Sequence, residues 1–160
     1  MMRRGERGQS WAAFGQGAEA CQDARAAAYQ TILSAFITSG QRCTCAPRLF
    51  LVRGEEADRF LEALVEMIGR IRVGYAEDAA EPFLGPVITA ETGQRVQRAQ
   101  KELLKRGATS PVPLESLRGN DALLSPGLLE ITSLGETGDE EIFGPLLQVT
   151  RVDSFAQAIE

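Results

Sequence analysis

Helical and strand-like patterns alternate along most of this chain of 160 residues. Apolar residues recur at helical spacing in three segments, which span residues 24–39, 55–70 and 90–106. Short apolar runs of the kind found in buried strands lie at 48–52, 127–132 and 146–152. Helices and strands in alternation build a largely parallel sheet flanked by helices. The sequence therefore predicts an α/β fold.

The ends of the predicted helices carry the usual boundary residues. Asp23 is placed to cap the first helix and Gly40 to end it, while Thr89 and Gly107 flank the third. The segment 153–160 opens with a capping pattern and an apolar stripe, then stops within about two helical turns. We expect this last segment to be an interrupted helix.

Composition excludes several classes of function. The net charge is −5, without the clustered Lys and Arg that binding to a phosphate backbone requires, so no nucleic-acid partner is expected. No apolar run is long enough for a membrane-spanning helix, and residues 1–15 lack the apolar core of a signal peptide. We expect a cytoplasmic protein that does not contact a membrane.

The chain contains no histidine, which restricts the chemistry available to it. Cys-His pairs, Ser-His-Asp triads and His-ligated metals are all excluded, so catalysis would depend on Cys, Glu, Asp, Lys or a bound cofactor. The three cysteines form no framework of paired spacings, which indicates reduced thiols rather than a disulfide scaffold.

Cys43 is the candidate nucleophile. It follows Gly40 at the junction between the first helix and the strand at 48–52, where a side chain can be both exposed and rigidly held. The adjacent Arg42 would favour the reactive thiolate. Position alone leaves open the alternative that Cys43 is a small buried hydrophobic residue.

The other cysteines have weaker interpretations. Cys45 forms a Cys-x-Cys pair with Cys43, but two thiolates are too few ligands for a closed zinc site, so no metal is predicted. A reversible disulfide between Cys43 and Cys45 would instead make the chain a thiol redox protein. Cys21 is read as incidental.

Four motifs follow one another along the chain. The first, Phe36-x-x-x-Gly-Gln-Arg-Cys43, is similar to the active-site cysteine motif of the aldehyde dehydrogenase superfamily. Similar landmarks follow in the family's order: Leu-Gly-Pro-Val-Ile at 84–88, Ser-Pro-Gly-Leu-Leu at 125–129 and Glu-Glu-Ile-Phe-Gly-Pro at 140–145. The resemblance runs from about Asp23 to the end of the chain. It implies a partial catalytic domain at 23–160, preceded by an unmatched segment at 1–22.

The resemblance also implies roles for individual residues. Cys43 would attack an aldehyde, forming a thiohemiacetal and then a thioester as a hydride passes to NAD. Glu141 and Phe143 would bind the nicotinamide ribose and ring of NAD. Without the Phe-Gly-Pro that follows it, Glu141 would read as part of a solvated acidic cluster. The intact family enzyme would be a homo-oligomer.

Two stretches, GQRCTCAPRL and LLSPGLLEIT, are most similar to the branch of the family that oxidises N-succinylglutamate 5-semialdehyde in arginine degradation. Arg42 and Arg48 are candidates for binding the carboxylates of such a substrate, because guanidinium groups pair bidentately with carboxylates. Ordinary surface roles for both arginines remain open.

The chain also departs from the family. The Glu-x-Gly-Gly motif that should precede Cys43 and supply the general base is absent, and residues 1–22 replace neither it nor the glycine-rich cofactor loop. The closing Asn and Tyr-Gly-Leu region is absent downstream. We therefore expect a domain truncated at both ends and inactive in isolation. The alternative is a non-catalytic remnant or an interaction module that binds an intact dehydrogenase subunit.

Overall fold

The computed structural model describes residues 11–14, 24–135 and 140–159. The elements, in chain order, are β1 (Trp11–Phe14), α1 (Ala24–Phe36), the 3-10 helix η1 (Ile37–Gly40), β2 (Arg48–Val52), α2 (Glu55–Ile68), α3 (Ala90–Lys105), β3 (Thr109–Val112), β4 (Ser116–Leu117), β5 (Asn120–Leu124), β6 (Gly127–Glu130), the 3-10 helix η2 (Thr132–Leu134), β7 (Leu146–Val152) and α4 (Phe155–Ile159).

The main sheet has the strand order β1-β2-β7-β6-β3. β1, β2, β7 and β6 pair in parallel, and β3 adds an antiparallel edge to β6. Parallel strands need helical crossovers, which α2 supplies after β2. The prediction of a largely parallel sheet flanked by helices is confirmed. β4 and β5 form a separate antiparallel pair.

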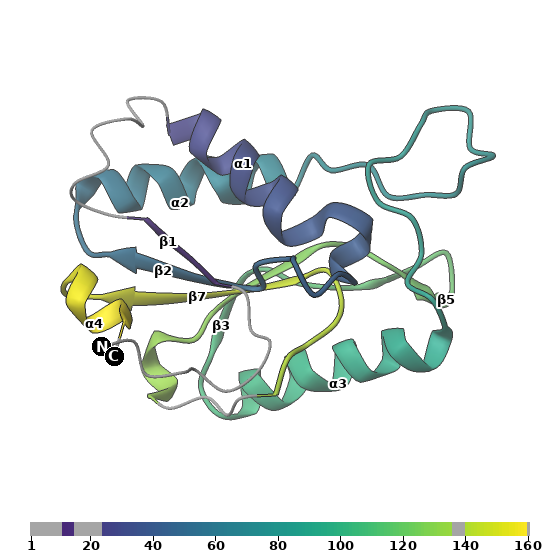
Figure 1. The fold of residues 1–160 in the computed structure, drawn as a ribbon. Helices are drawn as coiled ribbons and strands as arrows, with labels where there is room; N and C mark the ends of the chain where they lie inside the picture. The colour runs from purple at the N-terminus through teal and green to yellow at the C-terminus, as the bar shows by residue number, and fades with distance from the viewer. Residues whose placement is uncertain (1–10, 15–23, 136–139, 160) are drawn as a thin grey trace.

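Helices cover both faces of the sheet (Figure 1). α1 and α2 lie side by side above it, and α3 crosses below it beside β5. On the upper face Leu49 and Leu51 of β2 pack in one apolar core with Phe36 of α1 and Phe60 of α2. Leu129 and Leu146 belong to a second core with α3 below. The alternation of side chains along each strand separates the two cores.

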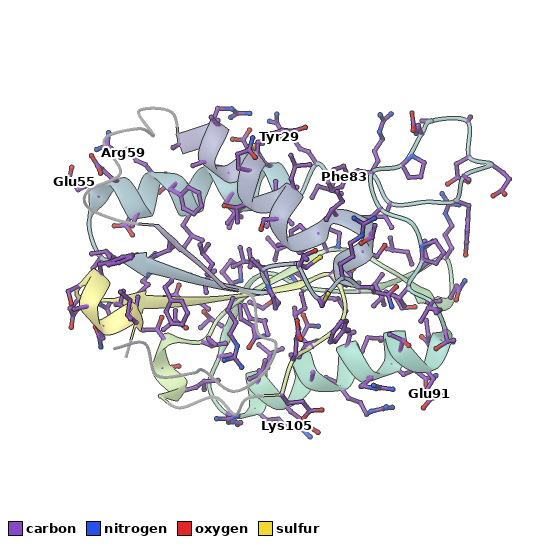
Figure 2. All side chains as sticks on the ribbon, viewed as in Figure 1. Tyr29, Glu55, Arg59, Phe83, Glu91 and Lys105 are labelled. Carbon is purple, nitrogen blue, oxygen red and sulfur yellow. The ribbon has the colours of Figure 1, made fainter. Side chains whose placement is uncertain are left out.

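α2 and α3 are amphipathic, which fixes the face that each presents to the sheet. Figure 2 shows Glu55 and Arg59 of α2, and Glu91 and Lys105 of α3, at the periphery of the molecule. α3 begins at the predicted cap, because the Thr89 hydroxyl accepts the amide of Thr92 at 3.1 Å.

The apolar pattern of residues 90–106 predicts an inward stripe of Val96, Ala99, Leu103 and Leu104. The inward face of α3 differs from this prediction. Leu104 is 38% exposed, whereas Gln100 is buried and takes an inward position. Its side-chain amide donates to the Leu114 carbonyl at 2.9 Å, and its carbonyl accepts the Leu114 amide at 2.8 Å. A polar side chain can be buried here because both of its hydrogen-bonding groups have partners.

Other differences from the predicted elements have local causes. The first helix ends at Phe36 instead of continuing to Ser39, because Thr38 and Ser39 adopt left-handed backbone angles. β3, β4 and β5 were not predicted, since their short segments lack a sustained alternating pattern. The proposed cap at Asp23 lies outside the described residues. Within those residues, no helix combines the length and apolar character needed to cross a membrane.

Candidate active site

Cys43 lies on an exposed turn between η1 and β2. The turn is closed by the Cys45 amide, which donates to the Arg42 carbonyl at 2.9 Å. Before it, Thr38, Ser39 and Gly40 have φ angles of 53°, 57° and 67°. Left-handed conformations are unfavourable for residues with a β-carbon, and such strain persists only where the surroundings hold it. The structure therefore places the predicted nucleophile at the end of a strained segment.

Gly40 brings the cysteine loop, residues 37–45, against the segment of the Glu-Ile-Phe-Gly-Pro motif. A β-carbon added at Gly40 would lie 2.6 Å from the carbonyl carbon of Gly144 and closer still to its oxygen. Gly144 in turn lies against Val96 of α3, where a β-carbon would overlap the valine methyl groups. Glycine is required at both positions because the two backbones approach so closely.

The cysteine loop also contacts the Leu-Gly-Pro-Val-Ile segment. The buried Ser39 hydroxyl donates to the Gly85 carbonyl at 2.8 Å, and the Gln41 side-chain oxygen accepts the Ile88 amide at 3.1 Å. The Ser-Pro-Gly-Leu-Leu motif contacts the Glu-Glu-Ile-Phe-Gly-Pro motif, because the Gly127 amide donates to the Pro145 carbonyl at 2.8 Å. Segments that are far apart in the sequence thus meet around the loop that carries Cys43.

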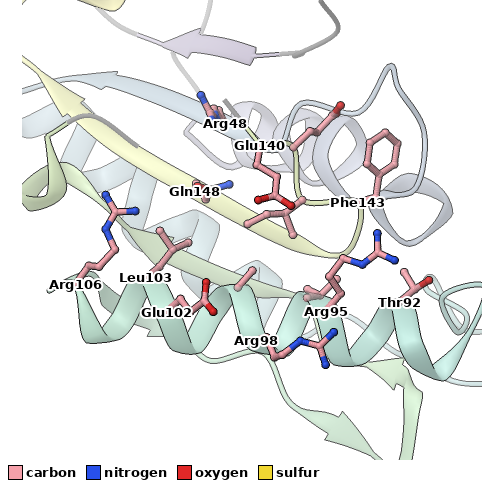
Figure 3. Close-up of a pocket in the computed structure, with 14 residues that line it drawn as sticks. Arg48, Thr92, Arg95, Arg98, Glu102, Leu103, Arg106, Glu140, Phe143 and Gln148 are labelled. Carbon is pink, nitrogen blue, oxygen red and sulfur yellow. The ribbon is translucent and has the colours of Figure 1, made fainter. Parts of the chain in front are cut away.

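A cleft of about 400 Å³ lies beside this junction, between α3 and β7 (Figure 3). Glu141 and Phe143, the predicted cofactor-binding residues, both line it. Figure 3 shows Arg95, Arg98, Glu102 and Arg106 along α3, with Gln148 of β7 opposite. The lining contains four arginines and three glutamates around an apolar floor that includes Val96, Ala99 and Leu103. This combination suits a ligand with both apolar and anionic parts.

Cys43 is not among the residues that line the cleft. The two predicted parts of the site are therefore adjacent but distinct: an exposed thiol on one loop and a charged cleft beside the next. Gly40 and Gly144 join them through direct backbone contact.

Comparison with known proteins identifies the family. The sequence profile described as "Aldehyde dehydrogenase family" matches residues 18–160. The chain belongs to the aldehyde dehydrogenase family. The resemblance inferred from the four motifs is thereby confirmed, and members of this family are oxidoreductases.

Individual relatives support the same assignment. The chain is 43% identical over 137 residues to N-succinylglutamate 5-semialdehyde dehydrogenase of Ectopseudomonas mendocina, covering 86% of this chain and 28% of that protein. Its fold matches methylmalonate-semialdehyde dehydrogenase from Oceanimonas doudoroffii, with TM-score 0.78, 28% identity and coverage of 94% and 31%. It also matches 1-pyrroline-5-carboxylate dehydrogenase from Thermus with bound NAD, with TM-score 0.75, 32% identity and coverage of 94% and 28%. The chain thus spans little more than a quarter of these relatives.

The other residues singled out in the sequence lie in different places in the structure. Arg42 is exposed beside Cys43, whereas Arg48 lies in β2 and lines the cleft. Cys45 is buried, and its thiol donates to the Ile37 carbonyl at 3.5 Å. Neither Cys43 nor Cys45 is in a disulfide. Cys21 lies outside the described residues. Among the residues that are described, no group of three or more His, Cys, Asp or Glu side chains could hold a metal ion.

Sequence reasoning missed several residues of the site. Gln41 was read only as part of a motif and Ser39 only as the end of the first helix, although both make hydrogen bonds to the 85–88 segment. Arg95, Arg98, Glu102 and Arg106 were not singled out in the sequence, yet they line the cleft. Their spacing of three to four residues puts them on one side of the helix, which was the available indication.

Proposed function

We propose that this chain supplies the nucleophile and one wall of the cofactor site of an NAD-dependent aldehyde dehydrogenase. The observation that carries the proposal is the contact of Gly40 with Gly144, which joins the Cys43 loop to the segment bearing Glu141 and Phe143. Membership of the family supports the reaction class, because its members oxidise aldehydes with NAD or NADP. The residue roles below follow from the matched motifs together with this geometry.

Cys43 performs the covalent step. Its thiolate adds to the carbonyl carbon, a C–S bond forms, and the former π-electron pair moves to the oxygen as the thiohemiacetal anion. By resemblance to the family, the backbone amide at Cys43 donates to this oxygen, and such donors are effective because they are already oriented before the reaction. The exposure of Cys43 leaves room for an aldehyde to approach the sulfur.

The cleft fits a nicotinamide cofactor. Glu141 can accept hydrogen bonds from ribose hydroxyls, and the ring of Phe143 offers an aromatic face beside them. The guanidinium groups of Arg95 and Arg98 suit the cofactor phosphates. When bound, the nicotinamide supplies the hydride acceptor for oxidation of the aldehyde carbon, which leaves an acyl group on the Cys43 sulfur.

N-succinylglutamate 5-semialdehyde is the proposed substrate. The first support is the 43% identity to a dehydrogenase named for that aldehyde. The second is Arg42, which is exposed next to Cys43 and can pair with a carboxylate of the substrate. Arg48 is less suited to this role, because it lines the cofactor cleft instead.

Release of the acyl group requires a base that this chain does not contribute through the family motif. No Glu-x-Gly-Gly sequence occurs among the residues before Cys43. We propose that the chain by itself captures aldehyde without turnover, and that complete oxidation requires the remaining parts of a dehydrogenase.

Thiol protection tests this proposal without requiring turnover. The purified chain is alkylated with iodoacetamide, and modification of Cys43 is followed by peptide mass spectrometry. N-succinylglutamate 5-semialdehyde should slow Cys43 labelling at concentrations where propanal, which lacks carboxylates, does not. Arg42→Gln should remove this difference, which is judged for each variant as the ratio of the Cys43 labelling rates with and without aldehyde. Equal protection by both aldehydes would contradict the assigned substrate, and no protection by either would contradict aldehyde capture.

A second candidate function is an interaction module that binds an intact dehydrogenase subunit. The observation that favours it is the apolar surface of α4, where Phe155 and Ile159 are 52% and 59% exposed. Apolar side chains exposed together mark protein contacts more often than isolated ones do. Co-purification with a full-length homologue should occur and should be lost in Phe155→Ser/Ile159→Ser. Capture that is unaffected by these changes, or no capture, would contradict the module.

A further inference from the structure

The side chain of Gln41 connects two segments that are 47 residues apart in sequence. Its Oε1 accepts the backbone amide of Ile88 at 3.1 Å. Two residues earlier, the Ser39 hydroxyl donates to the Gly85 carbonyl at 2.8 Å. The cysteine loop is therefore attached to both ends of the short 85–88 segment. Ile88 is 80% exposed, so its own side chain does little to hold this segment in place.

The segment that Gln41 holds leads directly into the helix that walls the cleft. Ile88 precedes Thr89, which caps the first turn of α3 by accepting the Thr92 amide at 3.1 Å. Thr92, in this first turn, and Arg95, in the next, line the cleft. A displacement of the 85–88 segment would thus displace the cysteine loop relative to the beginning of α3.

We propose that Gln41 is a positioning residue, which keeps Cys43 in register with the cofactor cleft by accepting the Ile88 amide. The inference rests on the proposed function, because it takes Cys43 as the nucleophile and the cleft as the cofactor site. Gln41 itself does not contact the reacting atoms in this proposal. It acts through the backbone of the loop on one side and through the N-terminus of α3 on the other.

The loop needs such an attachment because its backbone is strained. Thr38 and Ser39 are held in left-handed conformations that residues with a β-carbon adopt only under constraint. The close approach of Gly40 to Gly144 fixes one side of the loop, and the Gln41 hydrogen bond fixes the other. Loss of that bond would let the strained segment relax. Relaxation would expose Cys45, whose buried thiol donates to the Ile37 carbonyl inside the same loop.

Two substitutions separate the acceptor from the shape of the side chain. Gln41→Glu keeps an oxygen that can accept the Ile88 amide, whereas Gln41→Met keeps the length and removes the acceptor. Gln94→Met is the matched control, since Gln94 makes a comparable exposed hydrogen bond to Asp121 at 2.8 Å, away from the cysteine loop. All three variants and the native chain are compared at equal fractions folded.

The first measurement is amide hydrogen exchange by NMR at Ile88, Gln41 and Cys45. Removal of one exposed hydrogen bond should accelerate exchange about fivefold in Gln41→Met. Gln41→Glu and Gln94→Met should match the native chain. The second measurement is alkylation by iodoacetamide, where the ratio of Cys45 to Cys43 labelling should rise about fivefold in Gln41→Met only.

Unchanged exchange and labelling in Gln41→Met would overturn the proposal. Equal effects of Gln41→Met and Gln41→Glu would also overturn it, because the acceptor would then not be the cause. An equal effect of Gln94→Met would do the same by showing a general loss of stability. None of these readouts requires turnover or cofactor, so a failure of the proposed function would be seen separately, in the thiol-protection experiment.

Discussion

The two faces of the sheet are covered in opposite ways. On the α1–α2 face, large side chains such as Phe36, Phe60 and Leu64 are fully buried and fill the space between helices and strands. On the α3 face, the helix approaches at Gly93, where a β-carbon would lie 2.7 Å from the Asp121 carbonyl carbon, and is held by the buried amide of Gln100. The first, closed face is filled by large side chains. The second, open face has a smaller apolar core around Val96, Leu103 and Leu146, and α3 is held there by these close contacts as well.

This difference determines where a ligand can bind. Close-packed apolar interiors leave no space larger than a water molecule. One side of α3 packs through Gly93 and Gln100, and the adjacent side, from Thr92 to Arg106, stands beside β7 as one wall of the charged cleft. The charged side chains of α2 and α3 also differ in where they lie. Glu66 of α2 pairs with Arg25 and Arg70 on the outer surface, while Arg95 and Arg98 of α3 line the cleft.

Phe60→Ala should have the largest effect on stability. Phe60 is fully buried in the closed face, and truncation of such a residue costs about 3–5 kcal/mol of unfolding free energy through lost burial and a cavity. Urea unfolding measures the loss. Nicotinamide cofactor binding by the remaining folded fraction should be unchanged, because Phe60 does not line the cleft. A loss below 1 kcal/mol would show that this face is not the closely packed one.

Gly93→Ala tests the close approach of the opposite face. The added β-carbon would collide with the Asp121 carbonyl, and overpacking of this kind costs about 2–3 kcal/mol. Unlike Phe60→Ala, it should also weaken cofactor binding, because α3 must move away from β5 and carry the cleft wall with it. Lys101→Gly compared with Lys101→Ala, at an exposed position of the same helix outside the cleft, measures the separate effect of glycine on helix propensity. Full stability in Gly93→Ala would contradict the observed approach.

Gln100→Leu tests whether the α3 face depends on polar contacts. Leucine fills a similar volume but leaves the Leu114 amide and carbonyl without their side-chain partner, which costs about 2 kcal/mol. Gln100→Glu separates the two bonds, because glutamate can accept from the amide but cannot donate to the carbonyl when ionised. Thermal unfolding at pH 7 provides the comparison. A leucine variant more stable than the native chain would show that this face prefers apolar filling.

The closed face could be predicted from the sequence more fully than the open one. The bounds of α2 and β2 were predicted to within two residues, from the apolar periodicity of residues 55–70 and the apolar run at 48–52. Large side chains that are buried on one face recur at regular spacing in the sequence. On the α3 face the pattern was misleading. Leu104 was expected inside but is exposed, and the burial of Gln100 was not predicted, since periodicity cannot reveal a buried amide whose partners come from another segment.

The site, too, could be predicted only in part from the sequence. The motifs named Cys43, Glu141 and Phe143, and the structure places the last two in a cleft and the first on the adjoining loop. Their roles remain predictions. The contact between Gly40 and Gly144 could not be predicted from spacing, because a glycine pattern shows backbone freedom but not which backbone approaches.

Phe143→Ala should separate binding from stability on the open face. The ring is 43% exposed, so its removal should change the unfolding free energy by less than about 0.5 kcal/mol. Loss of an aromatic face for the nicotinamide should weaken cofactor binding by about 1 kcal/mol, or roughly fivefold in Kd. Calorimetric titration with NAD measures this change in Kd. Unchanged binding would remove Phe143 from the cofactor site and leave the rest of the cleft to be tested through Arg95.

The smallest effect is expected outside both faces, at the ion pair between Asp78 and Arg118. The guanidinium group donates to both carboxylate oxygens, at 3.0 and 2.7 Å. This hydrogen bonding, with a further one from the Tyr75 amide, lowers the pKa of Asp78 below its usual 3.8. A lowered folded-state pKa means that the stabilisation is complete above about pH 4 and is lost as the pH falls through the folded value. Both side chains are partly exposed, so salt should weaken the pair.

Asp78→Asn removes the carboxylate and provides the comparison. The native chain should have the higher urea midpoint at pH 6, and the difference should shrink on acidification below pH 4 and in high salt. The pKa of Asp121 is also lowered, chiefly by the hydrogen bond that the Gln94 side chain donates to its carboxylate. Asp78→Asn leaves this bond in place, so Asp121 affects the native chain and the variant equally. If the difference in urea midpoint persisted at the lowest pH at which both chains fold, Asp78 would stabilise the fold through its shape and not through its charge. The loop at 74–82 would then be held by packing, like the closed face, rather than by polar contacts, like the open one.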